Sequence, residues 1–180
     1  DHFALAAMHR SGLTPSPAAT RETLIRRLSF ALTGLPPQPE AVREFVADDA
    51  ADAYTRLVDS LLESPQYGEK WGRWWLDMAR YTDRTASWLH QAGQPYLYRD
   101  WVVRALNQDM PYDAFIHRQL ATDLIPETGP EDLPALGFLG LSPTYWKELK
   151  LPCEVIKVIV ADEWEERVDA VSRTFLGLTV

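Results

Sequence analysis

Residues 65–84 hold the densest group of side chains that could do chemistry in this 180-residue chain. One helical face carries apolar and aromatic residues spaced 4, 3, 1, 3 and 3 apart: Tyr67, Trp71, Trp74, Trp75, Met78 and Tyr81. A second face carries polar residues spaced 4, 3 and 4 apart: Arg73, Asp77, Arg80 and Arg84. Tryptophan rings beside a carboxylate and a guanidinium suit the stacking of sugar rings and the binding of hydroxyls. The same stripe is also typical of a buried core with Asp77 in an ordinary ion pair, and this structural interpretation is the more common one.

Two further groups of charged residues follow along the chain. Arg99 and Asp100 are sequence neighbours, so on a helix they face different ways and would each meet a different partner. The acidic run at 162–166 is followed by arginines in i,i+4 acid-then-base order, which favours a solvated helix face. A glycoside hydrolase would instead need two acids converging on a sugar, and spacing along the chain does not indicate that convergence.

The elements that must position these residues are predicted to be helices separated by prolines. Apolar residues recur at helical spacing over 2–11, 21–33, 40–47, 52–63, 65–82, 96–108, 111–124, 135–141 and 160–176. Thr20 is expected to cap the second helix, and Pro39 occupies the first turn of the third. The β-branched run Val155–Val160 favours a strand but has no pairing partner. We expect an all-α fold, a compact array of seven to nine short helices with proline-rich turns and little or no strand, as a single domain over 1–180.

Composition excludes several classes of function. The net charge of −8 argues against nucleic acid as a partner, and no apolar run is long enough to span a membrane. The single cysteine, Cys153, excludes an internal disulfide framework, and the four histidines lack metal-binding spacing. No glycine-rich phosphate loop and no Gly-x-Ser-x-Gly elbow is present, so we expect neither a metal site nor a self-contained catalytic centre.

The order of several motifs resembles a planctomycete-type family, the domain of unknown function numbered fifteen forty-nine, which is associated with cytochrome-c-like modules. The matching stretches are 24–37, 64–71, 75–83, 98–103, 111–115, 119–124 and 162–180, together with Asn107. In that family the final Gly-Leu-Thr-Val run is followed by Cys-x-x-Cys-His, the c-type haem attachment signature. The resemblance therefore implies that this chain is a fragment of a larger exported protein, cut before that segment, although no signal peptide is visible here.

Two hypotheses of function follow. The resemblance implies a helical module without its own cofactor that packs beside or scaffolds a haem c segment of the longer protein, with neighbouring domains of the same polypeptide as its partners. The alternative is a domain that binds or processes a glycan, a polysaccharide for example, through a Trp/Asp/Arg surface. The candidate binding residues for the two hypotheses are Trp74, Trp75, Asp77, Arg80, Tyr81, Asp83, Arg99, Asp100 and Asp123, the last because it is a polar residue inside a matching stretch.

Overall fold

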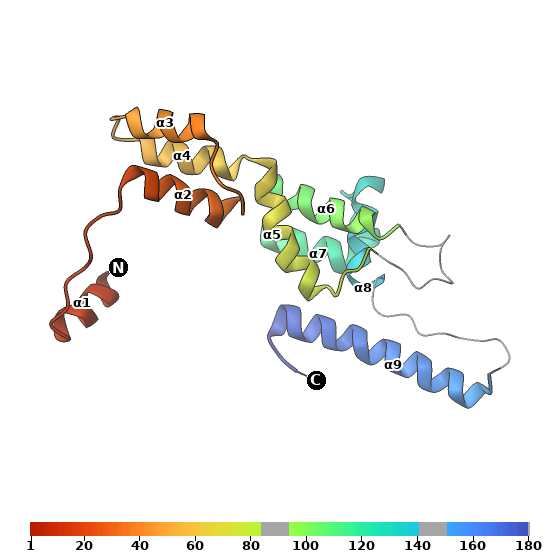
Figure 1. Cartoon of the computed structure of the whole chain (residues 1–180). Coiled ribbons are helices and arrows are strands. Elements are labelled where there is room, and N and C mark those ends of the chain that lie inside the picture. The colour runs from red at the N-terminus through yellow and green to blue at the C-terminus, as the bar shows by residue number, and fades with distance from the viewer. Residues whose placement is uncertain (84–93, 141–150, 180) are drawn as a thin grey trace. The chain divides into compact units, whose positions relative to one another are not determined.

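The computed structural model describes residues 1–83, 94–140 and 151–179, and every regular element in these ranges is helical (Figure 1). This confirms the all-α prediction. Arg84, the last residue of the predicted polar face, lies outside the described residues. The chain divides into two compact units, Asp1–Leu61 and Leu62–Val180, and the expectation of a single domain over 1–180 stays a prediction.

The first unit is built on α1 (His2–Arg10), α2 (Arg21–Leu32), α3 (Pro39–Ala47) and α4 (Ala53–Leu62). Thr20 caps α2 by accepting a hydrogen bond from the amide of Thr23, and Pro39 opens α3, both as predicted. Ile25, Phe45 and Ala53 are buried against one another and form the core that joins α2, α3 and α4.

The second unit contains the larger core and the remaining helices. Its elements are α5 (Pro65–Met78), α6 (Tyr96–Asn107), α7 (Tyr112–Ala121), the 3₁₀ helices η2 (Thr122–Leu124) and η3 (Pro130–Leu136), α8 (Gly137–Gly140), α9 (Cys153–Val171) and the π-helical turn η4 (Ser172–Leu176). Residues 126–134, which look like the most flexible stretch in the sequence, include most of η3.

Trp75 lies at the centre of this core. Its ring packs edge-on against Phe115 at a centroid distance of 4.8 Å and contacts Phe138 and Phe175 at 6.2 and 6.0 Å. Its indole N–H donates to the side-chain oxygen of Gln119 at 2.7 Å and to the Tyr98 hydroxyl at 3.1 Å. Buried polar groups are stable when they are paired in this way, so Trp75 both fills the core and orders it.

The expected strand at Val155–Val160 is wrong, because these residues form the first half of α9. β-Branched residues favour strands only weakly, and a helix satisfies its backbone hydrogen bonds without a partner strand. Pro152 precedes the helix, which begins at Cys153 rather than near residue 160. The aromatic helix is also shorter than predicted: α5 ends at Met78, and Arg80 adopts a left-handed conformation with φ of 57°.

Candidate functional site

The side chains with the greatest potential for binding lie where α5 and α6 pack closely together. Two glycines of α5, Gly68 and Gly72, permit this approach. A Cβ atom on Gly68 would lie 2.5 Å from the carbonyl oxygen of Val103, and one on Gly72 would lie 3.3 Å from a Val103 methyl group. Asn107 of α6 links the two helices, because its side chain accepts a hydrogen bond from the Gly68 amide at 2.8 Å and donates one to the Pro65 carbonyl at 3.1 Å.

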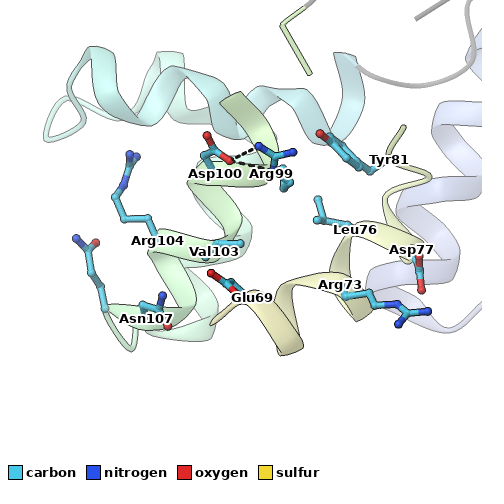
Figure 2. A pocket seen from close by; sticks show the side chains of 11 residues that line it. Glu69, Arg73, Leu76, Asp77, Tyr81, Arg99, Asp100, Val103, Arg104 and Asn107 are labelled. Carbon is cyan, nitrogen blue, oxygen red and sulfur yellow. Dashed lines mark hydrogen bonds and ion pairs between the residues drawn. The ribbon is translucent and has the colours of Figure 1, made fainter. Parts of the chain in front are cut away.

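A groove of about 890 Å³ opens between the two helices beside this contact (Figure 2). This volume falls within the range typical of small-molecule sites. The residues that line the groove are Glu69, Arg73, Leu76, Asp77, Tyr81, Arg99, Asp100, Val103, Arg104, Asn107 and Gln108. Three acids and three arginines are among them, so the lining carries no formal net charge.

One end of the groove is held by a cluster of paired groups. Arg99 lies 2.9 Å from Asp100 (Figure 2), and this hydrogen bond raises the pKa of Arg99. Arg99 also lies 3.2 Å from Asp83. The Tyr81 hydroxyl donates to the same Asp83 carboxylate. Partial burial and this hydrogen bond raise the pKa of Tyr81 to about 12. Tyr81 is therefore a neutral hydrogen-bonding group at physiological pH.

The α5 side of the groove is different. Glu69, Arg73 and Asp77 are exposed, and none of their side chains makes a hydrogen bond or ion pair with any residue that the structure describes. They lie four residues apart, so they form one row along the helix. The expected ion pair between Asp77 and Arg73 or Arg80 does not form. Along this row, Arg73 can donate hydrogen bonds to a ligand in the groove, and Glu69 and Asp77 on either side of it can accept them.

The structure brings together five of the nine predicted site residues. Asp77, Tyr81, Arg99 and Asp100 line the groove, and Asp83 is bonded to two of them.

Trp75 is buried in the core, whereas Trp74 is 62% exposed on α5, three residues before Asp77. Arg80 leaves the groove and pairs with Glu166 and Asp169 of α9. The acidic run at 162–166 is thus not wholly a solvated face, since Glu163 is also buried. Asp123 is exposed in η2.

Sequence reasoning missed most of the α6 side of the groove. Val103, Arg104, Asn107 and Gln108 carry no catalytic motif, and they become neighbours of α5 only through helix packing. The spacing Gly68-x-x-x-Gly72 is the signal that could have found them, because small residues four apart let a second helix approach.

The described residues show no group of three or more potential metal ligands. In the same part of the chain, we find no helix that is long and apolar enough to cross a membrane. What the groove offers is a mixture of hydrogen-bond donors and acceptors above aliphatic side chains.

Comparison with known protein families gives a match over the whole chain. The family model described as "PSCyt2: Protein of unknown function (DUF1549)" matches residues 1–180. No curated protein and no solved structure matches the chain.

Proposed function

Because the chain belongs to the PSCyt2 family of proteins of unknown function, we propose that it is a helical module that packs beside a c-type haem-bearing segment of a longer protein. The motif order described above supports this proposal, since the stretch 162–180 resembles the one that precedes a Cys-x-x-Cys-His segment in planctomycete-type relatives. Such relatives resemble exported proteins, and export to the periplasm, cell envelope or exterior is part of the proposal.

The observation that carries the proposal is the packing of residues 172–178. Phe175 is anchored in the core against Trp75 and Phe138, with a centroid distance of 5.1 Å to the latter. Gly177, with φ of 65°, ends the turn, and its neighbours Leu176 and Leu178 are 65% and 56% exposed. A turn that is anchored by Phe175 and presents two leucines to water is suited to burying apolar surface of an adjoining segment.

The residues of this chain do not themselves fit haem attachment. The c-type attachment motif contains two cysteines that bond covalently to the haem and a histidine that binds its iron, whereas Cys153 is a lone, exposed cysteine at the start of α9. The proposed haem therefore belongs to residues that follow Val180, and the role of this module is to position them.

The experiment is to express the chain extended beyond Val180 in a host that matures c-type cytochromes, and to record the visible spectrum. We expect covalent haem absorbance and a melting temperature that haem attachment raises. Leu176→Asp with Leu178→Asp should remove that gain, whereas Leu133→Asp, at a leucine of η3 with 50% exposure, should retain it. Absence of haem absorbance, or an equal gain in all variants, would contradict the proposal.

Glycan binding is the second candidate, and the groove between α5 and α6 favours it. The predicted Trp/Asp/Arg surface does not form as a whole, because Trp75 is in the core and Arg80 binds α9. Four of its residues, Asp77, Tyr81, Arg99 and Asp100, line the same groove.

A further inference from the structure

We infer that the groove between α5 and α6 binds a neutral, polyhydroxylated ligand, a sugar unit of a glycan, and that the row Glu69, Arg73 and Asp77 makes the contacts that select it. This inference deepens the glycan-binding candidate and is independent of the haem-positioning proposal.

The unpaired groups of the groove decide where a ligand would bind. Arg99 is already engaged by two carboxylates, and Arg104 donates to the Glu131 carbonyl at 2.7 Å. The row on α5 has no such partners among the described residues. Charged groups that the fold leaves unpaired can form strong hydrogen bonds with a ligand without first breaking internal ones.

The order of charges in the row fits hydroxyl groups. Arg73 has only donors, and the flanking carboxylates of Glu69 and Asp77 have only acceptors. Residues four apart on a helix are separated by roughly 6 Å along its axis. A sugar hydroxyl both donates and accepts, so neighbouring hydroxyls can bond to an arginine and a carboxylate at once, which a simple anion or cation cannot do.

The charge balance of the lining argues against an anionic ligand. Sites for phosphate or carboxylate need an excess of positive charge. Here three carboxylates oppose three guanidiniums, and Arg99 is neutralised locally by Asp83 and Asp100. An anion in this groove would lie against Glu69 and Asp77, so a neutral ligand is favoured.

The middle of the groove supplies apolar contact. In Figure 2, Leu76 and Val103 lie between the polar side chains of the two helices, and Tyr81 borders the same space. All three are half-buried. Mostly apolar walls with a few placed polar groups are typical of small-molecule sites, and the C–H face of a sugar ring would lie on these side chains.

The test is a titration of the 180-residue chain with defined oligosaccharides, in which ligand-observed NMR and calorimetry measure binding. The neutral probes are maltotetraose, cellotetraose and tetra-N-acetylchitotetraose. The anionic probes are tetragalacturonate and inorganic phosphate. We expect at least one neutral tetrasaccharide to bind, and to bind more tightly than either anion.

Two pairs of variants locate the site. Asp77→Asn and Arg73→Gln should each weaken binding about tenfold or more, the usual effect of losing a hydrogen bond to a charged group. Asp59→Asn on α4 and Arg27→Gln on α2 are the matched controls, since both residues are exposed and lie in the other unit. The controls should bind as the parent does, and circular dichroism should show the same helix content for all four variants.

Three results would overturn the inference: no neutral saccharide binds, an anionic probe binds more tightly than every neutral one, or the Asp77 and Arg73 variants bind within twofold of the parent. Haem absorbance of the extended chain is read separately, so its loss would contradict the haem-positioning proposal and leave the saccharide titration interpretable.

Discussion

The two faces of α5 differ in whether their polar side chains are hydrogen-bonded within the protein. On the core face, the Trp75 N–H, the Tyr98 hydroxyl and the Gln119 amide bond to one another, and Gln119 also donates to the Phe115 carbonyl at 3.0 Å. On the groove face, the side chains of Glu69, Arg73 and Asp77 bond to none of the residues that the structure describes. Polar groups satisfied within the protein stabilise the fold, whereas polar groups left unpaired beside a groove are available to a ligand.

The largest effect expected from this comparison concerns Trp74 and Trp75, which are adjacent in sequence. Trp75→Ala should lower the free energy of unfolding by about 3–5 kcal/mol, because it leaves a core cavity and removes the indole N–H that donates to Gln119 and Tyr98. Trp74→Ala, at a mostly exposed side chain, should change it by about 0.5 kcal/mol or less. Urea denaturation measures both values, and similar losses for the two variants would refute the assignment of Trp75 alone to the core.

Close packing of α5 on α6 should give the next largest effect. Gly68→Ala should cost about 1–3 kcal/mol, because its new methyl group would overlap the backbone carbonyl of Val103. Gly140→Ala is the matched control, since open space surrounds that position at the end of α8. Urea denaturation again provides the measurement. If Gly68→Ala were as stable as the Gly140→Ala control, the two helices would be farther apart, and the groove between them wider, than described.

The smallest effect should come from Tyr81 at the end of the groove. Its folded pKa is raised to about 12 from a usual value near 10. The stability that its neutral form contributes is therefore complete below about pH 10 and is lost as the pH rises through about 12. Tyr81→Phe should make the loss of unfolding free energy over this interval smaller, and its absorbance titration should lack a tyrosinate that forms near pH 12. An unchanged alkaline profile would contradict the raised pKa of Tyr81.

Local features of the fold could be predicted because they depend on residues near one another in the chain. The cap at Thr20, the first-turn proline of α3 and the helical spacing of α5 all act within one or two turns. The run Val155–Val160 was misjudged because its β-branched side chains favour a strand only weakly, and a helix satisfies their backbone hydrogen bonds locally.

The candidate site could be predicted only in part. Asp77, Tyr81, Arg99 and Asp100 were found because charged and aromatic residues cluster around them in sequence. Arg80 was assigned to the same face by helical spacing, but α5 ends before it and the left-handed turn directs it to Asp169. Val103 and Gln108 belong to the groove through contacts between helices, which sequence spacing within one helix does not report.

The helical class, most helix boundaries and the family follow from the linear chain, because hydrophobic periodicity, capping residues and motif order are properties of the sequence. Which polar side chains are paired and which are unpaired depends instead on how the helices pack in three dimensions. Trp74 and Trp75 are neighbours of the same residue type. Arginines of the same region, such as Arg73 and Arg80, likewise differ only in their surroundings. Their different roles depend on which helix each side chain meets, and that is set by long-range packing rather than by residue type.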